Sequence, residues 1–195
     1  MRGSCLAADD LDSGANILRR PLTGQTMRKV LYILGELSDD DVEWLAAHGS
    51  REKVKQGHIL VTQGKPLSCL YFILDGQFEV SVAGGGRLAL VGCGEIIGEI
   101  SMIDGRPPTA TVSALSDGVV LALERSRLQK KLAADIAFAA HFYRAVAHFL
   151  AERMRATVQR IGSKQAQDVE LDESLLDNVH LAGARFDRIL KRFQG

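Results

Sequence analysis

The chain has 195 residues, of which 46% are hydrophobic and 25% are charged, with 24 basic residues against 24 acidic ones. This length suits one compact domain with extensions, or at most two small domains. A net charge of zero gives no overall attraction to nucleic acid or to anionic lipid, so any site for an anion must be local.

The N-terminal region, residues 1–34, is predicted to be an arm with one short helix near residues 15–20. Its first residues lack the apolar stretch of a signal peptide, and no apolar run approaches the length that spans a membrane. The cysteines Cys5, Cys69 and Cys93 are widely spaced and have no metal-ligand pattern. We therefore predict a cytoplasmic protein without membrane contact.

A helix is predicted to begin after Ser38, whose hydroxyl can accept a hydrogen bond from the first turn. The acidic residues 39–41 suit that turn, and Gly49 is expected to end the helix after His48. From Val54 onward, short segments rich in Val, Ile, Leu and Phe alternate with glycines. This pattern predicts a β-barrel or β-roll, with strands around residues 71–74, 78–82, 88–91, 111–115 and 119–123, a turn at Asp75-Gly76 and a hairpin tip at 84–86.

Two helices are predicted after the strands, a short one over 126–133 and a long one over 136–161. On the long helix, apolar residues step by four and three positions, which is the spacing of a coiled-coil seam: Tyr143, Ala147, Leu150, Met154, Thr157 and Ile161. We predict a homodimer with paired long helices. The alternative is a helix that packs on its own domain.

The most informative stretch is Gly94–Val112. It reads as a glycine-permitted turn, one or two turns of helix, a second glycine turn, and a Pro107-Pro108 entry into a strand. A helix start beside a glycine presents free backbone N–H groups, which attract phosphate or carboxylate. Glu99 at that position could accept hydrogen bonds from sugar hydroxyls, and Arg106 and Thr109 could donate to an anion.

This order of residues resembles the phosphate-binding segment of the cyclic-nucleotide-binding domain family, which includes the catabolite activator protein and the regulatory subunits of protein kinase A. Gly98-Glu99 and Thr109-Ala110-Thr111-Val112 carry the resemblance. It extends over residues 37–162, from the first helix through the long one. The resemblance implies an α+β fold, in which an antiparallel β-roll is flanked by N-terminal helices and a long C-terminal dimer helix.

The resemblance also implies a set of nucleotide-binding residues. Glu99, after Gly98, would hold the ribose 2′-hydroxyl, and the backbone amides of Ile100 and Ser101 would hold the cyclic phosphate. Thr109 and Ala110 would add a hydroxyl and an amide. Proline stands at position 108, where the family has the arginine that pairs with the phosphate. Arg106 either turns into the site as a substitute or stays solvated.

Thr157 is a second candidate, because Met154–Gly162 resembles the end of the long helix of the catabolite activator protein, where a Thr-Ser pair contacts the base. Thr157 stands at the Thr and Val158 at the Ser. The hydroxyl of Thr157 would then contact the nucleotide base. The alternative is a hydrogen bond from this hydroxyl to the helix carbonyl one turn earlier.

Several other functions are not supported by the residue pattern. The glycines of 88–98 resemble a dinucleotide-binding loop, but their spacing is one residue too long and no long helix follows. The histidines form no metal-ligand cluster, and no nucleophile–base spacing indicates catalysis. Residues 163–195 are too few, and too balanced in charge, for a DNA-binding helix-turn-helix domain.

We therefore predict four regions: an arm (1–34), a cyclic-nucleotide-binding β-roll (35–134), a dimerisation helix (135–162) and a short helical tail (163–195). The predicted function is a non-enzymatic sensor of cAMP or cGMP, without cofactor or metal, that signals to a dimer mate or to a protein partner docked on the tail. The alternatives are a degenerate dimeric interaction module that no longer binds nucleotide, and a truncated transcription regulator.

Overall fold

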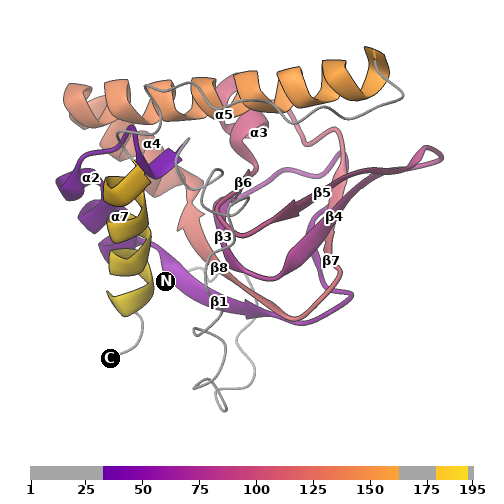
Figure 1. Ribbon diagram of the computed structural model, residues 1–195, viewed down its shortest axis with the longest axis horizontal. Helices are drawn as coiled ribbons and strands as arrows, with labels where there is room; N and C mark the ends of the chain where they lie inside the picture. Colours follow the sequence, from indigo (N-terminus) through magenta and orange to yellow (C-terminus); the bar gives the residue numbers. More distant parts are fainter. Residues whose placement is uncertain (1–32, 163–178, 193–195) are drawn as a thin grey trace.

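The computed structural model describes residues 33–162 and 179–192. They form a β-roll with helices at one side and a long helix lying across it (Figure 1). Two antiparallel four-stranded sheets have the strand orders β1-β8-β3-β6 and β2-β7-β4-β5. The strands are β1 (Ser50–Val54), β2 (Ile59–Val61), β3 (Cys69–Asp75), β4 (Gln77–Val82), β5 (Gly86–Gly92), β6 (Ile96–Ile97), β7 (Thr111–Ala114) and β8 (Gly118–Glu124). The predicted α+β β-roll is confirmed.

The described helices agree with the pattern of the sequence. They are α2 (Asp39–His48), α3 (Glu99–Asp104), α4 (Arg125–Ala134), α5 (Ile136–Gly162) and α7 (Val179–Arg192). The long helix α5 has 27 residues and is therefore about 40 Å long. In Figure 1, α3 lies beneath the middle of α5, and α7 stands beside α2.

Two apolar clusters hold the fold together. One fills the space between the two sheets and contains the fully buried Phe78. The other lies between the first sheet and the helices, and it includes Phe138 of α5 and Phe186 of α7. Strand β3 contributes to both clusters, so it is buried at every position except its last. This explains why its sequence is a continuous apolar run rather than an alternating one.

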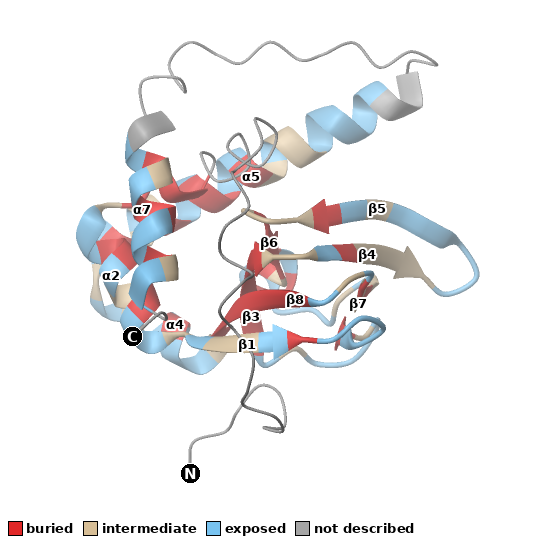
Figure 2. Ribbon diagram, turned by 60° about the horizontal axis from the view of Figure 1, so that its bottom comes forward, coloured by how far each residue is buried: buried red, intermediate tan, exposed pale blue. Residues whose placement is uncertain are grey.

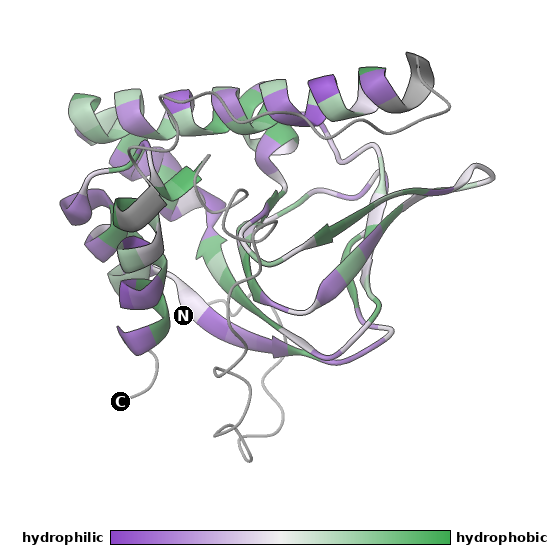
Figure 3. Cartoon of the chain, viewed as in Figure 1, coloured by the Kyte–Doolittle hydropathy of each residue, from purple (hydrophilic) through white to green (hydrophobic). Residues whose placement is uncertain are grey.

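The strands predicted from the sequence did not include β1, β2 or β6. Strand β1 is polar, as its hydrophilic colour beside the hydrophobic β8 shows in Figure 3, and its first four residues are exposed or half-buried. It is held by pairing with β8, where Glu52 lies opposite Val120. Strand β6 has only two residues, both buried, and it pairs with Tyr71 and Phe72 of β3. The sequences of β1 and β6 show no strand pattern of their own, because both strands are defined by backbone pairing to a distant segment.

Helix α2 begins and ends where the sequence predicts. The Ser38 hydroxyl accepts from the backbone N–H of Asp41 (3.1 Å), and the Asp41 carboxylate accepts from the Ser38 N–H (2.7 Å), which makes a capping box. Gly49 follows the last turn with an extended backbone. Glycine is needed there because a Cβ would lie 2.6 Å from the Leu121 side chain.

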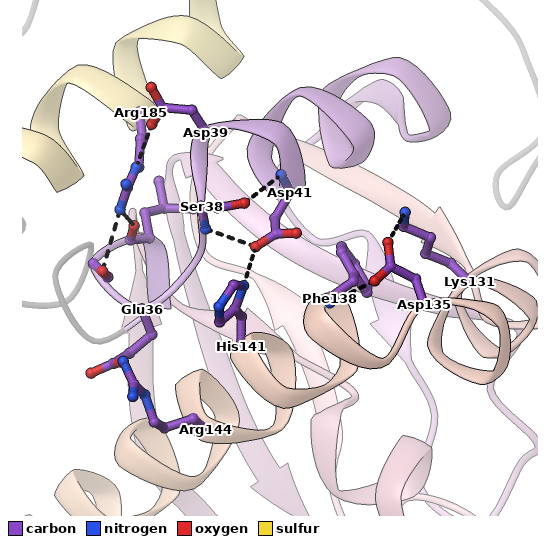
Figure 4. Close-up of polar contacts among 12 residues, drawn as sticks. Glu36, Ser38, Asp39, Asp41, Lys131, Asp135, Phe138, His141, Arg144 and Arg185 are labelled. Atoms are coloured by element: carbon purple, nitrogen blue, oxygen red, sulfur yellow. Dashed lines mark hydrogen bonds and ion pairs between the residues drawn. The ribbon is translucent and has the colours of Figure 1, made fainter.

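Asp41 also joins α2 to α5, because its carboxylate lies 2.8 Å from Nδ1 of His141 (Figure 4). Burial tends to raise the pKa of Asp41, but hydrogen bonds from Ser38 and His141 outweigh it, and the pKa lies below its usual value. We expect Asp41→Ala to lower the free energy of unfolding at pH 7 by about 1–3 kcal/mol, because it removes half of the capping box and leaves the Ser38 N–H unpaired. Urea unfolding would measure this loss.

The matched control is Asp40→Ala, which removes an exposed carboxylate from the same turn and should cost much less. The pH dependence has a definite sign, because a lowered pKa means that the folded state releases the proton more readily than the unfolded one. The stabilisation by Asp41 is therefore complete above the unfolded pKa of about 3.9 and is lost as pH falls through the lower folded value. Equal stability of the two variants at pH 7 would contradict this role.

The C-terminal tail contains a helix that packs on the domain. Helix α7 buries Ala182, Phe186 and Ile189 in the core cluster. The Arg185 guanidinium donates to the carboxylate of Asp39 (2.8 Å; Figure 4) and also to the carbonyl of Leu34 (2.9 Å). Within the short helical tail predicted over 163–195, the structure has one helix over 179–192, with 163–178 and 193–195 outside the described residues.

The long helix α5 is buried along only part of its length. Among its residues 136–159, the buried side chains run from Phe138 to Phe149, and Figure 2 shows exposed and half-buried colours over 150–159. Near its start α5 is tied to the segment before α2, where Arg144 pairs with the Glu36 carboxylate (Figure 4). Of the predicted arm over 1–34, residues 1–32 lie outside the described residues, whereas Ile33 and Leu34 are buried in the core cluster. None of the described helices is both long and apolar enough to cross a bilayer.

Candidate functional site: the start of helix α3

The turn into α3 has a geometry that requires glycine. Gly98 caps the helix with φ of +96°, a left-handed conformation that other residues adopt at a cost. A Cβ on Gly98 would also lie 2.5 Å from the Leu67 side chain. Gly105 ends the helix, again with positive φ. The two glycines confine α3 to six residues, Glu99–Asp104, as the sequence predicts.

Glu99 lies at the first position of α3 and is 3% exposed. Its Oε1 accepts a hydrogen bond of 2.7 Å from Nη1 of Arg153 on α5. Burial raises the pKa of Glu99 above its usual value, and the positive charge of Arg153 opposes that shift. A buried carboxylate with a cationic partner is the kind of acceptor that could hold a sugar hydroxyl.

Arg153 is held between α5 and α3. Its guanidinium carbon lies 4.6 Å from the ring centre of Phe149, one turn earlier on α5, and Phe149 is buried in the core cluster. Such stacking of a guanidinium on an aromatic face is favourable and limits the directions the side chain can take. The ion pair with Glu99 therefore joins the start of α3 to the long helix.

The loop after α3 does not bring a second arginine to Glu99. The Arg106 side chain is 84% exposed and lies beside Asp104, whose carboxylate accepts from the Arg106 backbone N–H (2.9 Å). Pro108 is half-buried, and its carbonyl accepts from the N–H of Gly64 (2.8 Å). The sequence left open whether Arg106 turns into the site or stays solvated, and in this structure it is solvated.

The remaining predicted residues border the same segment. Thr109 is exposed and Ala110 is half-buried, directly before β7. Ile100 is exposed on α3, whereas Ser101 is 5% exposed. Gly98 and Ser101 line a small hollow together with Leu67, Cys69, Leu70, Met102 and Arg125.

Thr157 lies one turn beyond Arg153 on α5 and is exposed. Its hydroxyl donates to the carbonyl of Arg153 (2.8 Å). In this structure the hydroxyl therefore serves the helix, which is the alternative that the sequence left open. A role for Thr157 in contacting a nucleotide base stays a prediction.

The sequence pattern did not single out Arg153 or Arg125 as site residues. Arg153 is 54 positions from Glu99, so only the fold brings the two together. The available signal was its position on the helix, because residues 149, 153 and 157 step by four and share one face. Arg125, at the start of α4, lines the hollow beside Gly98 and Ser101, and its position after β8 gave no sign of this.

Residues 51–135 match the family model for the cyclic nucleotide-binding domain. These residues form a domain of the cyclic nucleotide-binding family. The family match spans β1 to the end of α4 and includes the whole segment from Gly98 to Ala110. The fold agrees with this assignment, because the crystal structure of a cyclic nucleotide-binding domain from Methylobacillus flagellatus superposes with a TM-score of 0.62 at 27% identity, covering 75% of this chain and 88% of that one.

Two curated relatives place this domain in larger proteins. An uncharacterized NTE family protein of Mycobacterium tuberculosis is 28% identical over 142 residues, which are 73% of this chain and 24% of the relative. A cAMP-dependent protein kinase regulatory subunit of Debaryomyces hansenii is 32% identical over 113 residues, which are 58% of this chain and 25% of that one. The chain thus spans about a quarter of the length of each of these relatives.

Proposed function

We propose that the protein is a sensor of the Crp-Fnr type that binds cAMP or cGMP between the β-roll and α5, without catalysing a reaction. The observation that carries this proposal is the buried carboxylate of Glu99, set directly after the left-handed Gly98 within the family segment. A carboxylate costs free energy to bury, and at 3% exposure Glu99 is compensated in this structure by the ion pair with Arg153. The ribose 2′-hydroxyl is the partner we assign to it in the bound state.

The other assignments follow from the same segment. We assign the cyclic phosphate to the backbone amides of Ile100 and Ser101, together with Thr109 and Ala110. Arg106 is close in sequence, but its exposed side chain would have to turn inward to contribute. The region boundaries at 34, 134 and 162, a protein partner at the tail, a cytoplasmic location and the lack of DNA binding remain part of the proposal.

The test is isothermal titration calorimetry of the full chain with cAMP, cGMP and cyclic dinucleotides. We expect one cyclic mononucleotide to bind with a dissociation constant in the micromolar range or weaker, because position 108 lacks the family's arginine. A charge-assisted hydrogen bond contributes about 1.5–3 kcal/mol, so its loss weakens binding by about tenfold to a hundredfold. Absence of binding to every cyclic nucleotide would contradict the proposal.

A degenerate interaction module is the second candidate function. Two observations favour it: Pro108 carries no charge, and Arg153 already occupies the Glu99 carboxylate. Such a module would bind no nucleotide and would still associate through α5. Both candidates are expected to dimerise and only the sensor binds nucleotide, so calorimetry with cyclic nucleotides distinguishes them.

We propose that α5 forms a homodimer through its exposed apolar stripe. Tyr143, Met154 and Val158 are 49%, 70% and 62% exposed, which is unusual for large apolar side chains on one helix. Leu150, a member of the stripe predicted from sequence, is half-buried against the domain's own core. Some residues of the stripe therefore pack against the core of their own domain, whereas others are exposed to solvent.

Met154→Glu is the variant that tests the dimer, because it places a charge in the proposed interface without touching the core. We expect light scattering to give the mass of a dimer for the native chain and of a monomer for the variant. The control is Ala137→Glu, which adds the same charge at an exposed position of α5 outside the stripe. A native monomer, or an unchanged mass for Met154→Glu, would refute the dimer.

A further inference from the structure

The proposed ligand is an anion, and the bound state needs a positive charge close to it. Glu99 is itself acidic and buried, so a cyclic phosphate at the start of α3 would bring two negative charges together in a poorly solvated place. Like charges in such a site strongly disfavour each other unless a cation lies between them. Pro108 cannot supply that cation, and Arg106 lies out in solvent.

Arg153 is the cation that the fold already places there. It touches Glu99 at 2.7 Å and stacks on Phe149, while its side chain remains 32% exposed. In the described part of the chain its guanidinium makes one hydrogen bond, the bond to Glu99. A guanidinium has five N–H donors in a fixed planar fork, so most of them remain available to a second acceptor.

We infer that Arg153 supplies, from α5, the positive charge that binds the phosphate of the ligand, in place of the arginine that the family has at position 108. This inference rests on the proposed function. Glu99 keeps one edge of the guanidinium and accepts from the ribose hydroxyl, while another edge donates to a phosphate oxygen. The ion pair with Glu99 thereby positions the Arg153 guanidinium before the ligand binds.

This arrangement makes α5 a part of the binding site. Arg153 lies one turn after Phe149, which is the last buried side chain of α5 within residues 136–159. The two outward-facing residues Met154 and Val158 lie within five positions of Arg153. A ligand held by Arg153 therefore acts directly on the half of α5 that carries the proposed dimer stripe.

The experiment compares native protein with Arg153→Gln and Arg153→Lys by competition against a fluorescent cAMP analogue. The control is Arg155→Gln, which removes the same charge two residues along α5, where Arg155 pairs with Glu152 instead. We expect Arg153→Gln to weaken cAMP binding by about tenfold to a hundredfold, and Arg155→Gln to change it by less than about twofold. Arg153→Lys should lie between native protein and Arg153→Gln, because it keeps the charge and loses the fork.

Two further measurements distinguish a phosphate contact from a structural role. Adenosine has the base and the ribose hydroxyl but no phosphate charge. Arg153→Gln should therefore weaken cAMP binding much more than adenosine binding, which lowers the dissociation constant of adenosine divided by that of cAMP. Pro108→Arg, added to Arg153→Gln, should recover much of the lost cAMP affinity, because it restores a guanidinium at the family's position. Thermal unfolding without ligand checks that each variant folds.

Three results would overturn the inference. Tighter binding of both cAMP and adenosine by Arg153→Gln would show that Arg153 only blocks Glu99. Unchanged cAMP affinity in Arg153→Gln would show that the backbone amides suffice. If native protein and the single variant Pro108→Arg both fail to bind any cyclic nucleotide, the proposed function fails and the inference fails with it, a result different from the other two.

Discussion

Glu99→Gln should weaken cyclic-nucleotide binding by about thirtyfold or more, because a hydrogen bond to a buried charged group is worth about 2 kcal/mol. Glutamine keeps the length of the side chain and can still accept a hydrogen bond, so the loss of affinity measures the contribution of the negative charge. Calorimetry with cAMP and cGMP measures it. The control is Asp104→Asn, which removes a carboxylate from the exposed end of the same helix.

The unliganded protein should respond much less to this change. Ionised Glu99 is stabilised by Arg153 but carries the cost of burial, and its raised pKa shows that burial is the larger effect. Arg153 is partly exposed and can regain water when its partner is lost. We therefore expect the free energy of unfolding of Glu99→Gln to lie within about 1 kcal/mol of native.

The raised pKa of Glu99 also gives ligand binding a pH dependence. The ionised carboxylate is the stronger acceptor for a ribose hydroxyl, and it gains a proton as pH falls through its folded pKa, which lies above the usual glutamate value. Affinity should therefore decrease as the solution is acidified toward that pKa, and this dependence should vanish in Glu99→Gln. Equal affinities of native protein and Glu99→Gln at neutral pH would refute the assignment of the ribose to this residue.

Phe186→Ala should lower the free energy of unfolding by about 3–5 kcal/mol, the usual cost of deleting a buried aromatic ring and leaving a cavity. Phe186 belongs to α7, is 3% exposed, and lies in the same cluster as Phe138 of α5. The prediction therefore treats the C-terminal helix as part of the domain core. Chemical denaturation with a single cooperative transition would measure the loss.

Leu181→Ala is the matched control for this prediction. Leu181 is on the same helix but 48% exposed, so its truncation should cost much less than that of Phe186. The two variants change helix propensity in the same direction, because alanine is the better helix former in both cases. If Phe186→Ala and Leu181→Ala unfold at the same denaturant concentration, α7 is not part of the cooperative unit.

Local sequence determined most of the secondary structure and half of the candidate site. The Ser38 cap, the Gly76 turn and the hairpin tip near Gly84 each follow from the chemistry of one or two residues, and the structure has all of them. The same holds for Gly98-Glu99, because a left-handed turn before a short helix needs glycine in any fold. The long helix predicted over 136–161, a stretch without Gly or Pro, likewise agrees with the observed α5 (Ile136–Gly162).

Tertiary structure alone decided the partners of these elements. Strand β1 is polar and β6 has two residues, so pairing with β8 and β3 had to define them. Leu150 belongs to a regular stripe, and only packing shows that it faces its own core while Met154 faces outward. The Glu99–Arg153 ion pair joins residues 54 positions apart. Such a contact leaves no periodic or local trace in a sequence, because it depends on the angle at which α5 crosses the roll.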